Sequence, residues 1–225
     1  QIKHVVIDEA QDYNELQFLV IKELTGCSSL TIVGDSNQRL IPYNGDLPMH
    51  NIKNILTNCT VQEFRLNTSY RSTKEIMEYA NKYLDADPIV PIVRSGEKVC
   101  EVLISNRDEF KKSVLDKIND FKNKTYENIA IICKDIKESE EIFKLINGNT
   151  NIKIIDKEND IYHSGIVVLP SYFAKGLEFD AVIMVLDEPK NNIDLKTHKY
   201  KQEDKLRYVM ATRALHELQV IKKNF

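Results

Sequence analysis

The sequence predicts an α/β fold with parallel sheets, and two observations support this class. From residue 99 to the end of the chain, apolar runs alternate with amphipathic segments, as strands alternate with helices in parallel sheets. Several of these runs, including 129–133 and 166–169, contain no charged or strongly polar residue. Continuous runs of this kind are typical of strands that are buried on both faces of a sheet.

These patterns place the expected elements in chain order. The expected strands cover 4–8, 30–33, 60–66, 99–104, 129–133, 152–155, 166–169, 181–186 and 218–221. The expected helices cover 14–24, 49–56, 73–84, 108–121, 137–146 and 203–215. Loops or linkers are expected at 42–48, 85–91 and 189–201, which are polar or contain proline.

Local signals mark the ends of three helices. Ser72 with Glu75, and Asp135 with Glu138, have the spacing of a capping box, in which each side chain caps the other residue's backbone N–H. Gly26 is expected to end the first helix. The apolar face of that helix is expected to consist of Leu16, Leu19, Val20 and Leu24.

Composition indicates a globular protein of the cytoplasm. The chain has 225 residues, of which 42% are hydrophobic and 29% charged, and its formal net charge is -3. Any contact with nucleic acid must therefore come from a local patch. No apolar run approaches the length of a membrane span, and no signal peptide is present. The cysteines are widely spaced, so Cys27 and Cys133 are expected to be reduced core residues.

Polar side chains follow two of the expected strands. Asp8 and Glu9 stand at the end of the first, and Asp35 and Gln38 follow the second. In nucleotide hydrolysis, one carboxylate can hold Mg²⁺ while the next polarises the attacking water. An amide both donates and accepts, so it can orient a water against a phosphate. Taken singly, each segment also fits an ordinary polar strand end.

A charged loop and two arginines complete the set of candidates. The loop 175–178 contains a glycine between two buried strands, a place where α/β folds bind ligands, although a solvated loop has the same pattern. Arg71 lies where a strand is expected to lead into a helix, and arginine suits bidentate phosphate contacts. Arg213, expected on a late helix, could act as an arginine finger or face solvent.

Five segments occur in a diagnostic order. They read Asp-Glu-Ala-Gln-Asp at 8–12, Gly-Asp-Ser-Asn-Gln at 34–38, Tyr-Arg-Ser at 70–72, Ala-Lys-Gly-Leu-Glu-Phe at 174–179 and Thr-Arg-Ala at 212–214. This set resembles motifs II to VI of superfamily 1 helicases of the UvrD/Rep/PcrA type. The segments 170–182 and 212–218 are most similar to the HelD branch, UvrD-like ATPases that associate with bacterial RNA polymerase.

The resemblance implies RecA-like P-loop NTPase motor folds that use ATP and Mg²⁺. In the first motor domain, Asp8 would bind Mg²⁺ and Glu9 would be the catalytic base. Gln38 would sense the γ-phosphate, with Asp35 supporting its motif.

The resemblance also implies roles for the second motor domain. Arg71 and Arg213 would reach the γ-phosphate. Glu178 would hydrogen-bond the ribose, and Gly176 would let its loop, with Lys175, close over the nucleotide.

Two tyrosines correspond to positions that contact nucleic acid in such helicases. Tyr43 lies where the family carries a tryptophan that stacks on a base, and Tyr172 lies where it usually carries a histidine near the strand. Stacking tolerates any aromatic face. A simple turn tyrosine is an equally good interpretation of Tyr43.

The sequence departs from the family in two ways. The 225 residues contain neither a Gly-x-x-x-x-Gly-Lys-Ser/Thr phosphate-binding loop nor the glutamine motif that reads adenine. About a hundred residues separate Arg71 from Lys175, which leaves no room for the large inserted helical subdomain. We therefore expect 1–60 to be the C-terminal part of a first RecA-like domain and 61–225 a complete second one, with the N-terminal motor half in the same polypeptide. The isolated chain is expected to hydrolyse ATP poorly or not at all.

Two functions compete at this point. The first is an ATP-dependent superfamily 1 helicase or translocase that moves on single-stranded DNA. The alternative is a HelD-like ATPase that remodels or recycles RNA polymerase. A third interpretation, a degenerate structural remnant, is weaker because the six motif residues Asp8, Glu9, Gln38, Arg71, Glu178 and Arg213 are all present.

Overall fold

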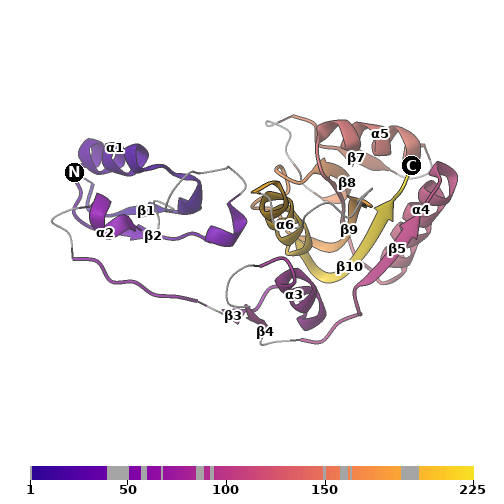
Figure 1. The fold of residues 1–225 in the computed structure, drawn as a ribbon, viewed down its shortest axis with the longest axis horizontal. Helices are drawn as coiled ribbons and strands as arrows, with labels where there is room; N and C mark the ends of the chain where they lie inside the picture. The colour runs from indigo at the N-terminus through magenta and orange to yellow at the C-terminus, as the bar shows by residue number, and fades with distance from the viewer. Residues whose placement is uncertain are drawn as a thin grey trace. The chain divides into compact units, whose positions relative to one another are not determined.

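The computed structural model in Figure 1 describes residues 2–39, 51–56, 60–66, 68–84, 89–91, 94–148, 151–157, 162, 164–188 and 198–225. The chain divides into two compact units, Gln1–Leu66 and Asn67–Phe225. Within the described ranges, no helix has the length and apolar character needed to cross a lipid bilayer.

In its described residues, the first unit contains a pair of short parallel strands and the α-helices α1 and α2. Strand β1 (Val5–Ile7) pairs with β2 (Leu30–Ile32), and α1 (Glu15–Thr25) connects them, followed later by α2 (Ile52–Ile55). The buried core of this unit consists of Ile7, Ala10, Phe18, Ile55 and Leu56. The strands and α1 agree with the predicted pattern. Of the predicted helix 49–56, residues 49 and 50 lie outside the described residues, and α2 covers Ile52–Ile55.

Helix α1 buries a different face from the one predicted. Phe18 is buried and Ile21 packs against the core, whereas the four residues of the predicted face are exposed. The helix carries two apolar stripes, and the stripe with the aromatic ring buries more area against the sheet. Gly26 ends the helix as predicted, with a left-handed φ of 55°.

The segment 60–66 was predicted to be a strand, and this prediction is wrong. Within the described part of the chain it is extended but pairs with no strand. Its apolar residues Phe64 and Leu66 are exposed. Alternation of apolar and polar residues predicts an extended backbone, but only a neighbouring strand turns that backbone into a sheet.

The second unit is built on a six-stranded parallel sheet with the order β5-β10-β9-β6-β8-β7. Its strands are β5 (Cys100–Ile104), β6 (Asn128–Cys133), β7 (Ile152–Ile154), β8 (Gly165–Pro170), β9 (Phe179–Asp187) and β10 (Ala214–Lys223). A separate parallel pair joins β3 (Thr68–Ser69) to β4 (Val90–Pro91). The predicted α/β fold with parallel sheets is confirmed.

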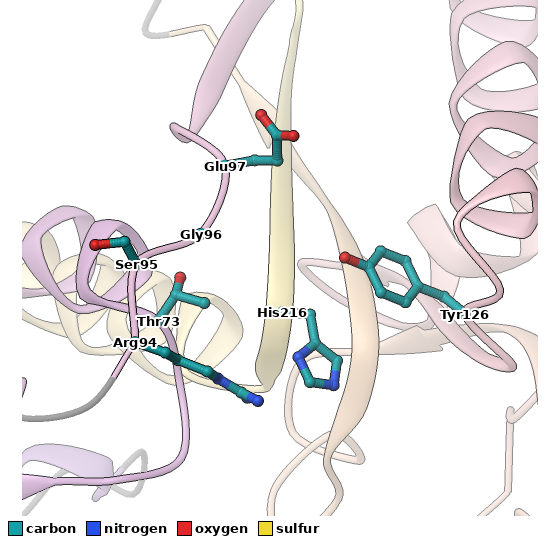
Figure 2. Close-up of a pocket in the computed structure, with 7 residues that line it drawn as sticks. All are labelled: Thr73, Arg94, Ser95, Gly96, Glu97, Tyr126 and His216. Atoms are coloured by element: carbon teal, nitrogen blue, oxygen red, sulfur yellow. The ribbon is translucent and has the colours of Figure 1, made fainter.

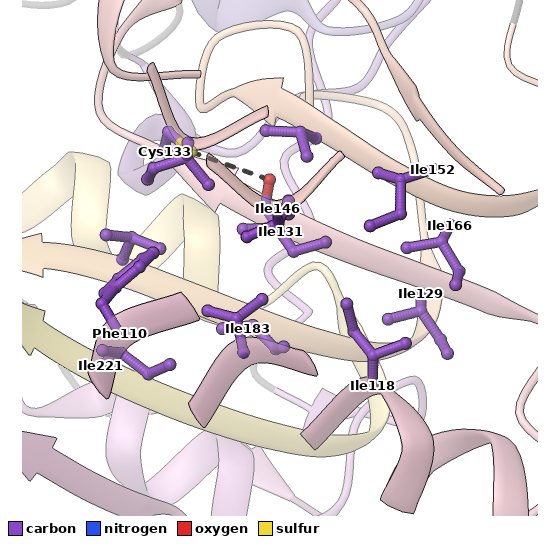
Figure 3. Packing of buried hydrophobic residues seen from close by; sticks show 14 of the residues in the cluster. Phe110, Ile118, Ile129, Ile131, Cys133, Ile146, Ile152, Ile166, Ile183 and Ile221 are labelled. Carbon is purple, nitrogen blue, oxygen red and sulfur yellow. Dashed lines mark hydrogen bonds between the residues drawn. The ribbon is translucent and has the colours of Figure 1, made fainter. Parts of the chain in front are cut away.

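Helices cover this sheet and supply its core. They are α3 (Lys74–Asn81), α4 (Arg107–Asn123), α5 (Ile136–Ile146) and α6 (His198–Ala211). Phe110, Ile118 and Ile146 from α4 and α5 pack on alternate strand residues such as Ile131 and Ile183 (Figure 3). Because successive strand side chains point to opposite faces, the other residues of the same strands face the opposite side. Cys133 is a free cysteine in this core, and Cys27 is free and buried in the first unit, both as predicted.

The predicted capping boxes differ in outcome. Thr73, and not Ser72, precedes α3, and the Ser72 hydroxyl donates to the carbonyl of Ala214 at 2.7 Å. Asp135 does cap α5, accepting from the N–H of Glu138 at 3.0 Å, while Glu138 accepts from the N–H of Lys134. Tertiary partners compete for the same side chains, so a local motif decides the bond only where no such partner lies near.

The last predicted helix ends earlier than expected. Helix α6 ends at Ala211 and β10 begins at Ala214, so Thr212 and Arg213 lie in a turn between them. The backbone N–H of Thr212 and of Arg213 still donate back into α6, to Tyr208 and Met210. The motif that was predicted to lie on a helix therefore lies in the turn before β10 and at the first residue of that strand.

Candidate functional site

Asp8 and Glu9 stand at the carboxyl end of β1, as the sequence predicted. Glu9 has a left-handed backbone with φ of 52°, which is costly for a residue with a β-carbon. Its own N–H donates to the Asp8 carboxylate at 2.8 Å. The left-handed turn directs two adjacent carboxylates away from the strand, and backbone strain of this kind is concentrated at functional sites.

Gln11 joins the two polar segments of the first unit, and the sequence analysis did not single it out. Its side-chain amide donates to Glu9 Oε2 at 2.5 Å, and its Oε1 accepts from the N–H of Asp35 at 2.9 Å. Gln11 is 1% exposed. The signal that could have identified it is an amide among acids in the segment 8–12, since an amide, unlike an ionised carboxylate, can both accept from a backbone N–H and donate to a carboxylate.

Gly34 makes this connection possible. A β-carbon at position 34 would lie 2.6 Å from Gln11 Oε1 and 3.0 Å from the backbone nitrogens of Ala10 and Gln11. Two of these three atoms are backbone and cannot rotate away. The glycine of the segment 34–38 is therefore needed for close approach to the segment 8–12.

Asp35 and Gln38 extend the same network. The Asp35 carboxylate accepts from the N–H of Asn37 at 2.9 Å and from the Gln38 side-chain amide at 3.0 Å. Asp8, Glu9, Gln11, Asp35 and Gln38 thus form one connected group, called here the carboxylate–amide cluster. Such a group can hold a water, and with it a phosphate, through several oriented donors and acceptors.

The residues at the end of β1 can be compared with what a magnesium ion requires. No group of three or more His, Cys, Asp or Glu side chains that could hold a metal occurs in the described ranges. Mg²⁺ commonly uses one or two carboxylates and completes its shell with phosphate oxygens and water. The exposed carboxylate of Asp8 at the strand end fits this arrangement.

In the second unit, two residues far apart in sequence face each other. Arg71 Nε lies 3.0 Å from Glu178 Oε1, and their side chains are 67% and 37% exposed. Glu178 follows Gly176, whose φ of 76° is the left-handed conformation that glycine adopts readily, and the half-buried Lys175 lies in the same loop. The structure therefore brings together a cation and a carboxylate that the sequence analysis nominated separately.

Arg213 is 3% exposed and packs beneath this loop. Its Nε donates to the carbonyl of Val209 at 3.1 Å and its Nη1 to the carbonyl of Leu177 at 3.4 Å. Its own carbonyl accepts from the N–H of Phe179 at 2.9 Å. Arg213 thus joins α6 to the loop that carries Glu178, and contact with a phosphate stays a prediction.

Comparison with known proteins shows that the chain is similar to DNA helicases. Residues 1–57 match the model of the UvrD/REP helicase N-terminal domain. A probable DNA helicase of Mycoplasma pneumoniae is 30% identical over 229 residues, which cover 95% of this chain and 42% of that protein. The crystal structure of the C-terminal domain of a possible DNA helicase from Lactobacillus strain WCFS1 is 29% identical, with a TM-score of 0.53, and the match covers 68% of this chain and 87% of that one.

These matches make the chain similar to UvrD/Rep-type DNA helicases. A further match is the ATP-dependent DNA helicase Rep of Buchnera aphidicola, 26% identical over 166 residues, 70% of this chain and 23% of that protein. The chain thus spans less than half the length of these curated helicases.

The two tyrosines that were predicted to contact nucleic acid are only partly described. Tyr172 is 43% exposed directly after β8 and stacks edge-on with Phe173, with ring centroids 4.6 Å apart. Tyr43 lies outside the described residues. Tyr70, which the sequence analysis quoted only within its motif, is exposed beside Arg71 and also offers an aromatic face.

Proposed function

We propose that this chain supplies motifs II to VI of an ATP-dependent DNA helicase or translocase that moves on single-stranded DNA. The observation that carries the proposal is the carboxylate–amide cluster, in which five polar residues from two strand ends are joined by side-chain and backbone hydrogen bonds. A strained backbone and a glycine needed for close approach both serve that network. These features are those of a reaction site rather than of a plain strand end.

Each member of the cluster has a proposed role in ATP hydrolysis. Asp8 holds Mg²⁺, which when bound neutralises charge on the phosphates. Glu9 accepts the proton of the attacking water as a general base, and its αL backbone and the Gln11 amide fix its direction. Gln38, held by Asp35, donates to the γ-phosphate or orients the water.

Residues of the second unit are proposed to bind the phosphate and the ribose of ATP. Arg71 contacts the γ-phosphate and Glu178 the ribose, while Gly176 and Lys175 form the loop beside them. Arg213 is proposed to reach the phosphate or to hold that loop in place, and its buried hydrogen bonds support the second of these. Arginine suits this role because its planar fork matches phosphate oxygens.

Nucleic-acid contacts are assigned to aromatic side chains. Tyr172 and Tyr43 are proposed to stack on bases of single-stranded DNA, and the exposure of Tyr172 supports its assignment.

A different role is proposed for Tyr70. Its ring is exposed next to Arg71, which is proposed to contact the γ-phosphate, and the ring is proposed to stack on the adenine base of ATP.

The proposal also concerns how the chain is divided. Residues 1–60 are assigned to the C-terminal part of a first RecA-like motor domain, and 61–225 to a complete second one without the large inserted subdomain. Within the described second unit, the segments from α3 to β8 belong to one α/β unit, which supports this assignment. Since the 225 residues contain no phosphate-binding loop, the chain by itself is expected to bind and hydrolyse ATP poorly.

The test is the rate of ATP hydrolysis with and without single-stranded DNA. It is measured on the chain alone and on the protein in which the chain is joined to its phosphate-binding loop. We expect turnover only in the second, rising with DNA and falling as salt is increased, because phosphate contacts release counterions. Absence of hydrolysis in the joined protein would rule out the proposed activity, and robust turnover by the chain alone would rule out the assigned division.

A second candidate function is a HelD-like ATPase that remodels or recycles RNA polymerase. The observation that favours it is the amino-acid sequence of segments 170–182 and 212–218, together with the six-stranded sheet of the second unit. Pull-down with purified RNA polymerase, compared with salt-dependent binding to single-stranded DNA, separates the two. Tight polymerase binding with no DNA stimulation of ATP hydrolysis would favour this candidate.

A further inference from the structure

The guanidinium of Arg94 joins two separate stretches of backbone in the second unit. Its Nη2 donates to the carbonyl of Arg71 at 3.0 Å and to the carbonyl of Leu215 at 2.9 Å. A terminal guanidinium nitrogen carries two hydrogens, so both bonds form at once. Hydrogen bonds from a cation are stronger than those between neutral groups. Arg94 thus ties the backbone of a motif arginine to the beginning of β10.

The carbonyl of Leu215 reaches Arg94 because β10 begins with a bulge. Ala214 pairs with Phe179 of β9, and the next regular pair is Glu217 with Ala181. Two residues of β10, Leu215 and His216, therefore face one residue of β9, which is the geometry of a bulge. A bulge takes backbone groups out of the ladder and leaves them for other partners. Here the carbonyl of Leu215, two residues after Arg213, accepts from the Arg94 side chain.

Arg94 is itself held at the start of α3. Its carbonyl accepts from the N–H of Lys74 at 2.9 Å, and the N–H of Gly96 donates to the Glu75 carboxylate at 2.6 Å. A β-carbon at position 96 would lie 2.6 Å from Thr73 Cγ2, so the segment passes closely over the first residues of the helix. Arg94 and Gly96 line a pocket with Thr73 and His216, as Figure 2 shows. The volume of this pocket is about 420 Å³.

We propose that Arg94 is a positioning residue for Arg71, an inference that rests on the proposed ATPase function. With its carbonyl fixed, Arg71 leaves the backbone in one direction, toward Glu178 at 3.0 Å. Ser72 supports the same arrangement, since its hydroxyl donates to Ala214 at 2.7 Å. Arg94 thereby fixes the position of the Arg71 backbone relative to the turn that contains Arg213, and it does so without contacting the nucleotide.

The first test needs no enzyme activity. Hydrogen exchange is measured on the chain with R94A and with the control R107A, which removes an exposed arginine from the same unit. In R94A, exchange is expected to speed up in 68–75 and 212–217 and to stay unchanged in 107–146. Unchanged exchange in the first two segments would overturn the inference.

The second test is ATP hydrolysis by the protein that carries its phosphate-binding loop. In R94A, kcat is expected to fall about 10- to 100-fold, because a misplacement of about 1 Å can cost about a hundredfold. The KM for ATP is expected to change by less than about threefold, and R94K, which keeps the charge, is expected to recover part of kcat. A kcat within about twofold of the wild type in folded R94A would overturn the inference.

The two tests also separate this inference from the proposed function. If the wild type shows no ATP hydrolysis, the proposed function fails, and hydrogen exchange alone decides whether Arg94 holds the Arg71 backbone. If R94A does not fold, R94K is measured by both methods, since a point charge without the planar fork forms the two bonds less well.

Discussion

Replacing Gln11 by leucine tests how the carboxylate–amide cluster works. The substitution keeps the approximate side-chain volume but removes the donor to Glu9 at 2.5 Å and the acceptor for Asp35 N–H at 2.9 Å. A hydrogen bond to a charged group contributes about 1.5–3 kcal/mol, and a buried donor left without a partner costs about 1–3 kcal/mol. If the bond to Glu9 orients the general base, its loss lowers kcat about 10- to 150-fold, at about 1.36 kcal/mol for each factor of ten.

The assay is steady-state ATP hydrolysis by the protein joined to its phosphate-binding loop. Circular dichroism establishes that each variant is folded. The matched control is Q62L, which replaces an exposed glutamine of the same unit. The KM for ATP is expected to change little, because Gln11 lies behind Glu9 and Asp35 and not at the surface. A folded Q11L with wild-type kcat would refute the role given to the network.

Two further predictions concern the second unit. The buried carboxylate of Glu217 is paired with Lys117 and Lys124, both at 2.8 Å. K117M/K124M leaves this carboxylate buried without a partner and should destabilise the unit by about 3–5 kcal/mol, whereas E217Q leaves two lysines that reach water and should cost less. Urea unfolding followed by circular dichroism checks this order of stabilities, and the reverse order would contradict the prediction. The pKa of His216 is lowered from 6.5 by burial and by the charge of Arg94, so the stability that neutral His216 contributes is present above 6.5 and is lost as pH falls below that value. In R94A the His216 pKa should rise toward 6.5 in an NMR titration, and an unchanged value would show that the two side chains are not near each other in solution.

Much of the second unit could be predicted from its sequence because buried parallel strands have continuous apolar runs. The segments 129–133, 166–169 and 181–186 all fall within β6, β8 and β9. The bulge at the start of β10 could not be predicted, since it depends on pairing with β9 and on contacts with Arg94. For the same reason, the capping box predicted at the start of α3 does not form, because the Ser72 hydroxyl donates to Ala214, 142 residues away in the chain.

The candidate site shows the same division between local and long-range information. Asp8, Glu9, Asp35 and Gln38 could be nominated because polar residues directly follow apolar strands. Gln11 and Arg94 were missed because they act on backbone groups of other segments, and no local pattern reports such partners. The face that α1 buries was mispredicted because the helix has two apolar stripes, and its own sequence does not show which of them packs against the sheet.

The central claim is that the carboxylate–amide cluster carries out ATP hydrolysis, with Glu9 as the general base. The most direct measurement is single-turnover hydrolysis by E9Q in the joined protein, with E23Q on the exposed part of α1 as control. The E9Q substitution is expected to lower the rate about 10²- to 10⁴-fold, the range for a general base, while ATP binding and the rate of E23Q stay near those of the wild type. Hydrolysis by E9Q at the wild-type rate would contradict the account.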